Sequence, residues 1–301
     1  MRQPDERRPF GRLVTAMVTP FTPSGELDVE GAQRLATYLV DDQRNDALVI
    51  SGTTGESPTT SDEEKDRLLR AVVEAVGDRA ALIAGVGTND TAHTTHLALA
   101  AEKAGADGLL LVTPYYNKPP QTGLLAHFRA AADATGLPAV IYDIPGRTGT
   151  AIATETLVAL AEHPRIVAVK DAKGDLEASA WVLARTDLAY YSGDDKLTLP
   201  LLSIGAVGVV GVPTHVVGSR TKDMIEAYER GDVAAALAGH RSMLPVYSGF
   251  FRTQAAILTK AALRLRGLPG GPVRLPLVDA TPDQVEVLKD DLAAAGVDVA
   301  G

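Results

Sequence analysis

Residues 166–171 read IVAVKD, an unbroken apolar run that ends in a lysine and an aspartate. The apolar part has the length of a short strand, and its continuity indicates that both faces are covered. Strands buried on both faces are typical of parallel sheets whose crossover connections are helices. This stretch therefore predicts a parallel strand with two charged side chains at its carboxyl end.

Similar runs rich in Val, Ile and Leu recur along the chain at intervals of roughly 20–35 residues, as repeated βα units would place them. With the first run they number eight, and they begin near Leu13, Ala47, Ala81, Gly108, Ala139, Ile166, Ala189 and Gly208. Eight strands that alternate with helices predict an α/β fold of the closed (β/α)8 or TIM-barrel type. An open doubly wound sheet is the alternative.

Helix signals lie between these runs. Ser61 and Glu64 have the spacing of a capping box, and Gly77 suits the end of the helix that follows. After Gly231 the strand signal fades, and Ala-rich helical segments continue to the end. We therefore expect a barrel domain over residues 1–231 and a small helical C-terminal domain over residues 232–301.

Composition excludes several classes of function. The 301 residues carry a net charge of −9 and no basic stripe, which argues against nucleic acid as a partner. The chain has no cysteine, so thiolate nucleophiles and Cys-based metal sites are excluded. The charged start, MRQPDERRPF, is unlike a signal peptide, and no apolar run reaches the ~18 residues of a membrane span. We expect a cytoplasmic protein without membrane association.

Chemically capable residues follow several of the predicted strands. The carboxyl ends of barrel strands meet at one rim, which is where such barrels build active sites. The residues expected at this rim are 51–56 (SGTTGE), 113–116 (TPYY), Tyr142, Arg147, Lys170, Asp171 and 192–195 (SGDD). Each is weak evidence alone, but their shared position indicates a catalytic site.

Lys170 gives the sharpest signal. Burial at the end of an apolar strand would lower its pKa and supply the neutral amine that attacks a ketone. Its position alone is equally compatible with a lysine that reaches solvent. Tyr142 and Tyr116 could transfer protons, the turn at residues 52–55 (GTTG) could hold a carboxylate, and Arg147 could bind one bidentately. Taken singly, each has an ordinary structural explanation.

Three apparent motifs carry less weight. Gly85 and Gly87 lack the third glycine of a dinucleotide fingerprint. His93 and His96 lack further ligands for a metal, and the pair Asp194–Asp195 is typical of a loop with local hydrogen bonds. We therefore predict neither a metal nor an organic cofactor.

Six segments together resemble the dihydrodipicolinate synthase / N-acetylneuraminate lyase superfamily, in particular its dihydrodipicolinate synthase branch. They are LVTAMVTPFTPSGELD (13–28), SGTTGESP (51–58), VTPYYNKPP (112–120), YDIPGRTG (142–149), VKDAKGD (169–175) and YYSGDD (190–195). The resemblance covers nearly the whole chain in order. It implies a Schiff-base lyase that condenses pyruvate with L-aspartate 4-semialdehyde in lysine and diaminopimelate biosynthesis, and a homotetramer that needs no cofactor.

The resemblance also implies roles for residues that match its motifs. Lys170 falls at the Schiff-base lysine and Tyr142 at the proton-transferring tyrosine. Thr54 and Tyr116 fall at its relay partners, Tyr116 being supplied by a neighbouring subunit. The residues implied in substrate binding are Thr53 and Thr54 for the pyruvate carboxylate, Arg147 for the semialdehyde carboxylate, and Gly193 and Val210 for the cavity wall.

Many members of the family are inhibited by lysine at a subunit interface. The corresponding positions here are Asp62, Lys65, Asn89, His93 and Tyr115. Compared with inhibited bacterial members, Lys65 adds a cation and His93 replaces a glutamate. This exchange of charges predicts weak or absent inhibition.

One segment departs from the family pattern. Gly211 and Pro213 stand where a Ser or Thr often follows the apolar pair of the eighth strand, which leaves the cavity shape and the aldehyde open. A sugar-acid aldolase or dehydratase, such as an N-acetylneuraminate lyase, would keep Lys170 and Tyr142 but take a polyhydroxylated substrate. A non-catalytic sensor on a barrel scaffold is the alternative from another class, although a pure binder needs no imine-forming lysine.

Overall fold

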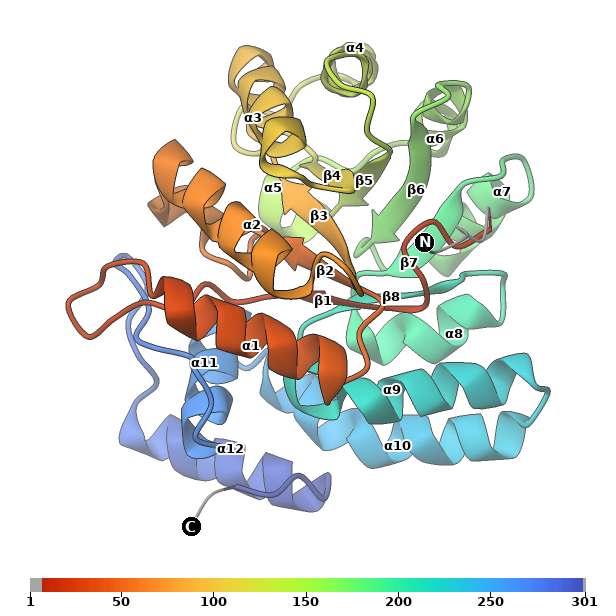
Figure 1. Ribbon diagram of the computed structural model, residues 1–301. Helices are drawn as coiled ribbons and strands as arrows, with labels where there is room; N and C mark the ends of the chain where they lie inside the picture. The colour runs from red at the N-terminus through yellow and green to blue at the C-terminus, as the bar shows by residue number, and fades with distance from the viewer. Residues whose placement is uncertain (1–6, 300–301) are drawn as a thin grey trace.

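The protein is a closed barrel of eight parallel strands, as the computed structural model, which describes residues 7–299, shows (Figure 1). Each strand pairs with the next, and β8 closes the sheet against β1. The strands are β1 (Leu13–Ala16), β2 (Ala47–Ile50), β3 (Ala81–Gly85), β4 (Gly108–Val112), β5 (Ala139–Asp143), β6 (Ile166–Asp171), β7 (Ala189–Ser192) and β8 (Gly208–Gly211). The predicted barrel is confirmed, the predicted strand starts coincide with the observed ones, and the open sheet is excluded.

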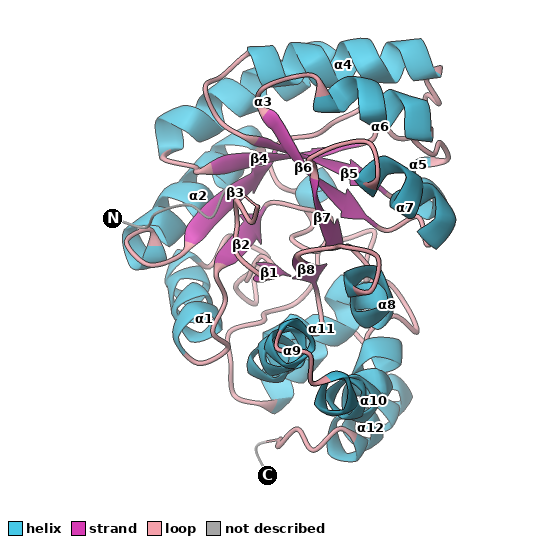
Figure 2. Ribbon diagram, turned by 90° about the vertical axis from the view of Figure 1, so that its right-hand side faces the viewer, coloured by secondary structure: helices cyan, strands magenta, loops and turns pink. Residues whose placement is uncertain are grey.

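Helices surround the strands, and Figure 2 shows α1 to α8 around the barrel with α9 to α12 gathered on one side. They are α1 (Val29–Asp41), α2 (Asp62–Val76), α3 (Thr91–Ala104), α4 (Gln121–Asp133), α5 (Pro145–Thr148), α6 (Thr154–Ala161), α7 (Leu176–Leu183), α8 (Thr198–Leu202), α9 (Thr214–Glu229), α10 (Val233–Gly249), α11 (Ala255–Leu265) and α12 (Pro282–Ala294). The capping box of Ser61 and Glu64 forms at the start of α2 as expected. Within residues 7–299, no helix is both long and apolar enough to cross a membrane, and the cytoplasmic location stays a prediction.

Strand register decides which side chains face the centre of the barrel. Lys170 pairs with Tyr142 on β5 and with Tyr191 on β7, so these three side chains share one level and one face. Their neighbours Val169 and Tyr190 point the other way and join the apolar layer beneath the surrounding helices. The alternation along β6 therefore directs the lysine into the barrel and packs the preceding residue, Val169, outside it.

The C-terminal helices pack directly onto the barrel. The turn between α9 and α10 contains Gly231, in the left-handed conformation at φ 81°, and Asp232, which caps α10. One apolar cluster extends from Val210 and Val212 of the barrel to Tyr247 of α10 and to Phe250, which caps this helix. The domain boundary at 231/232 falls in this turn and stays a prediction.

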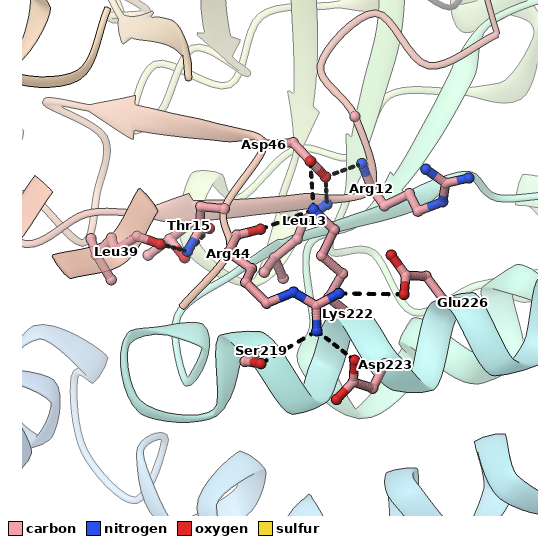
Figure 3. A network of polar contacts seen from close by, with 12 residues as sticks. Arg12, Leu13, Thr15, Leu39, Arg44, Asp46, Ser219, Lys222, Asp223 and Glu226 are labelled. Carbon is pink, nitrogen blue, oxygen red and sulfur yellow. Dashed lines mark hydrogen bonds and ion pairs between the residues drawn. The ribbon is translucent and has the colours of Figure 1, made fainter. Parts of the chain in front are cut away.

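Helix α9 is fixed to the amino-terminal ends of β1 and β2 by a polar network (Figure 3). Asp46 accepts hydrogen bonds from the backbone N–H of Leu13 at 3.0 Å and from Lys222 Nζ of α9 at 2.7 Å. Lys222 Nζ also donates to the carbonyl of Arg44, and the Arg44 guanidinium reaches Asp223 one residue further along α9. These bonds hold α9 along the barrel, with its first residues at the carboxyl end of β8.

Candidate active site

A cavity of about 190 Å³ opens at the carboxyl ends of the barrel strands. Its wall brings together seven residues expected at this rim from the sequence, namely Thr53, Thr54, Tyr142, Arg147, Lys170, Gly193 and Asp194. Further wall residues were not predicted, among them Lys196, Val212, Phe251 and Gln254. Phe251 and Gln254 come from the connection between α10 and α11, so the C-terminal helices complete the site. No local pattern in that connection marks it as part of a rim built by the strands.

Lys170 lies inside the barrel with only 4% of its surface exposed. Its Nζ is 4.2 Å from the centre of the Tyr142 ring and makes no hydrogen bond within residues 7–299. Burial lowers its pKa to about 8, an effect that Asp195 opposes and Arg147 reinforces. The buried amine therefore becomes neutral at a far lower pH than an exposed lysine, and it faces a cavity that can admit a ketone.

Lys260 shows why a lowered pKa does not identify the nucleophile by itself. This lysine of α11 is also fully buried, and burial lowers its pKa to about 8 as well. However, its Nζ donates to Glu56 at 2.5 Å and to the carbonyl of Pro272 at 2.7 Å, and it lies over the Phe21 ring. Lys260 is a structural cation held by hydrogen bonds, whereas Lys170 makes no hydrogen bond among the described residues and lies at a cavity.

The same ion pair shapes the turn that follows β2. Glu56 adopts a left-handed conformation, and its carboxylate also accepts the backbone N–H of Arg274 at 2.8 Å. Gly85 on the next strand lets the carbonyl of Ser51 approach, since a Cβ there would lie 2.5 Å from this oxygen. These contacts hold Thr53 and Thr54 at the cavity wall. The role of Glu56 was missed because its partners lie more than two hundred residues away in the chain.

Tyr142 is buried beside Lys170, and burial raises the pKa of its phenol to about 12, with Arg147 acting in the opposite direction. The hydroxyl is therefore protonated at neutral pH and suited to donate a proton. Within the described chain, no hydrogen bond joins this hydroxyl to Thr54 or Tyr116. Tyr116 is 90% exposed, has a positive φ of 76°, and lies off the wall of this cavity.

Gly211 and Pro213, where the sequence departs from the family pattern, affect the surroundings of Asp195 more than they affect the cavity. Val210 shares the inward face with Lys170 through the register, yet the cavity wall is formed by Val212, two residues further on. Gly211 lies against Asp195, because a Cβ there would be 2.3 Å from Asp195 Oδ1. The predicted local hydrogen bonding holds for Asp194, whose Oδ1 accepts the backbone N–H of Lys196. The prediction of local bonding was wrong for Asp195, which is fully buried and bonds to Val212.

The positions matched to the lysine site do not form one pocket within a single chain. Asp62 and Lys65 line a small cavity of about 30 Å³, and Tyr115 lines another of about 220 Å³ that shares Tyr142 and Arg147 with the cavity at Lys170. His93 Nε2 lies 2.9 Å from Asp62 Oδ2.

Lys65 and Asn89 also have partners of their own. Lys65 Nζ donates to the carbonyl of Thr60, and burial lowers the pKa of this lysine. Asn89 is exposed, and its carbonyl accepts a hydrogen bond from Asn117. Three or more His, Cys, Asp or Glu side chains with the arrangement of a metal site were not found among residues 7–299.

A family model, similar sequences and similar structures all relate this chain to the same family. The model of the dihydrodipicolinate synthetase family matches residues 9–295. The chain is 76% identical to a 4-hydroxy-tetrahydrodipicolinate synthase of Acidothermus cellulolyticus, over 96% of this chain and 93% of that relative. It is 64% identical to 4-hydroxy-tetrahydrodipicolinate synthase 2 of Streptomyces coelicolor, over 96% of both chains. Among solved structures, DHDPS from Cyanidioschyzon merolae with lysine bound superposes with a TM-score of 0.93, at 45% identity over 95% of this chain and 98% of that one.

Proposed function

Because the chain belongs to the dihydrodipicolinate synthetase family, we propose that it catalyses the 4-hydroxy-tetrahydrodipicolinate synthase reaction, the condensation of pyruvate with L-aspartate 4-semialdehyde in lysine and diaminopimelate biosynthesis. The observation that carries the mechanism is Lys170, a buried amine that lies at a cavity and 4.2 Å from the centre of the Tyr142 ring. This arrangement is the one that a Schiff-base lyase requires.

The proposed reaction begins when the neutral Lys170 amine adds to the keto carbon of pyruvate. Loss of water leaves an imine, whose protonated form withdraws electrons from the neighbouring methyl group. Loss of a methyl proton gives an enamine, and its carbon attacks the aldehyde. The amine of the semialdehyde then displaces Lys170 and closes the ring. No metal or organic cofactor takes part in these steps.

The side chains on the cavity wall fit the remaining tasks. Tyr142 transfers protons, with Thr54 and a partner subunit's copy of Tyr116 as the proposed relay. The turn that carries Thr53 and Thr54 binds the pyruvate carboxylate through hydroxyl and N–H groups. Arg147, exposed at the mouth, binds the carboxylate of the semialdehyde bidentately.

A substrate screen tests this proposal. Purified enzyme is given pyruvate with either L-aspartate 4-semialdehyde or N-acetylmannosamine, and product formation is measured for each pair. Turnover with the semialdehyde alone supports the synthase. Turnover with N-acetylmannosamine would instead support the sugar-acid aldolase, and no turnover with any aldehyde would support the sensor.

We also propose that the enzyme is a homo-oligomer, as the family resemblance implies a tetramer. The exposure of Tyr116 supports this, because a relay tyrosine that lies off its own chain's cavity has to act on another chain. Mixing inactive Tyr116→Phe chains with inactive Lys170→Ala chains should restore part of the activity in hybrid sites. Subunit exchange is verified by native mass spectrometry, and exchange without recovery would show that each site is built within one chain.

Inhibition by L-lysine should be weak or absent, with no clear effect below about 1 mM. The only anion among the exchanged positions, Asp62, already bonds to His93, and Lys65 adds a cation that would repel the ligand's amine. A loss of only ~1.4 kcal/mol weakens binding about tenfold. Steady-state rates across lysine concentrations measure this.

His93→Glu is the matched variant for the lysine prediction, because it returns an anion to the position and releases Asp62. It should increase sensitivity to lysine. Strong inhibition of the unaltered enzyme well below millimolar concentration would show that the argument from charge is wrong.

A further inference from the structure

Asp195 is a buried carboxylate with an incomplete set of partners. It begins the short helix η2 (Asp195–Leu197) that follows β7, and none of its surface is exposed. Its Oδ2 accepts the backbone N–H of Val212 at 3.2 Å. Its Oδ1 has no hydrogen-bond partner within residues 7–299. Buried carboxylates are normally paired or fully hydrogen-bonded, so Asp195 needs another interaction whenever it is ionised.

Two glycines allow Asp195 and Lys170 to approach the same region of the barrel. At Gly211 a Cβ would lie 2.3 Å from Asp195 Oδ1, so the missing side chain on β8 makes room for the carboxylate. At Gly193 a Cβ would lie 3.1 Å from Lys170 Cγ, so the turn between β7 and Asp195 also passes close to the lysine. Val212, which holds Asp195, shares the cavity wall with Lys170.

The charged side chains around Lys170 and Asp195 also indicate that these two groups interact. The charged side chains that act on Lys170 are Asp195 and Arg147, of which only Asp195 favours a cation. Those that act on Asp195 are its neighbour Asp194 and Lys170, of which only Lys170 favours an anion. The buried Tyr142 and Tyr247 face Lys170 and Asp195 from β5 and α10. Burial raises the pKa of Asp195 to about 7, so the group is ionised in mildly alkaline solution.

We propose that the Asp195 carboxylate is the buried counter-ion of the Lys170 nitrogen and stabilises its positive charge both before and after pyruvate binds. The proposal rests on the proposed function for its second part. An ammonium and a ketone together give a protonated imine and one water, so the single positive charge stays on the same nitrogen. Asp195 is thus a positioning residue that acts through Lys170, and Gly211 is the position that admits it.

The test measures the pKa of Lys170 without substrate, by competitive labelling with trace acetic anhydride across pH and mass spectrometry of the Lys170 peptide. Asp195→Asn keeps an oxygen for the Val212 N–H but removes the charge. The midpoint for Lys170 should then fall by about one pH unit, because the remaining influences of burial and Arg147 both disfavour the ammonium. An unchanged midpoint would overturn the proposal. A rise would overturn it too, since it would indicate a loosened site in which water reaches the lysine.

Two further variants complete the design. Asp143, next to Tyr142 in the chain, is another buried carboxyl, and it is not among the groups that act on Lys170. Asp143→Asn should therefore leave the titration midpoint of Lys170 unchanged. Gly211→Ala displaces Asp195 without altering it, and should shift the midpoint in the same direction if Asp195→Asn does not fold.

Borohydride trapping with pyruvate then links the charge to the reaction. In Asp195→Asn the pyruvate concentration for half-maximal trapping should rise about tenfold. Absence of trapping in the unaltered enzyme would count against the proposed function alone, because the titration of Lys170 is measured independently of pyruvate.

Discussion

Lys170→Arg should leave no pyruvate on the enzyme after reduction with borohydride, and kcat should fall by about 10⁴-fold or more, the scale seen when a nucleophile is lost. The arginine keeps a cation of similar length in the barrel, but its guanidinium stays protonated and cannot form an imine. In the unaltered enzyme one reduced pyruvate should be found per chain, at Lys170. The measurement is mass spectrometry of the intact and digested protein after incubation with pyruvate and borohydride.

The rate of trapping at Lys170 should also depend on pH in a defined direction. Burial lowers the pKa of Lys170 to about 8, and attack requires the neutral amine. The initial rate of trapping should therefore rise with pH and level off above about pH 8, well below the value of ~10.4 for a free lysine.

Lys173→Arg is the matched control, since Lys173 is a cation three residues further along whose Nζ lies 3.7 Å from Asp143. It should still be trapped at Lys170. Label found on Lys260, the other buried lysine whose pKa is lowered, would show that the wrong nucleophile had been chosen.

Tyr142→Phe should lower kcat by about 10²–10⁴-fold, the usual contribution of a positioned acid–base group. The phenyl ring keeps the contact over Lys170 Nζ, so the change removes the proton donor and little else. Trapping should become slower but still reach one pyruvate per chain, because a proton-transfer group changes the rate of imine formation and not its equilibrium. Steady-state kinetics and a time course of trapping measure the two effects.

Tyr190→Phe provides the comparison. Tyr190 is also a buried strand tyrosine whose pKa is raised by burial, but it points out of the barrel into the apolar layer under the helices. Its loss should change kcat by no more than a few-fold. An equal loss in both variants would indicate that the barrel had been disturbed and would contradict a specific role for the Tyr142 hydroxyl.

Local chemistry explains why the barrel could be predicted from the sequence. Runs such as Ala47–Ile50 and Ile166–Val169 are short, apolar and β-branched, so periodicity and length identify a buried parallel strand without tertiary information. The rim residues followed from this, because a residue that ends a barrel strand lies at the catalytic face whatever its neighbours are. Lys170 and Tyr142 were expected at the rim for this reason, and the register places them side by side.

Local sequence patterns could not predict the contacts between residues that lie far apart in the chain. Glu56 looked like part of an ordinary loop, and only the folded chain brings Lys260 to it and makes it an anchor for the turn. Phe251 and Gln254 reach the cavity from a connection between helices that carries no motif. Asp195 was expected to bond locally like Asp194, because the sequence does not reveal that Gly211 leaves room for it inside the barrel.

The sequence by itself thus determined the eight strands and where they start, and it placed Lys170 at the end of one of them, because each depends on patterns within about ten residues. The tertiary structure alone decided that Lys260 is hydrogen-bonded to Glu56 while Lys170 faces a cavity, that Tyr116 is exposed and lies off the wall of this cavity, and that Asp195 is fully buried. These properties depend on solvent exclusion and on partners far apart in the chain. Neither is encoded in the spacing of neighbouring residues.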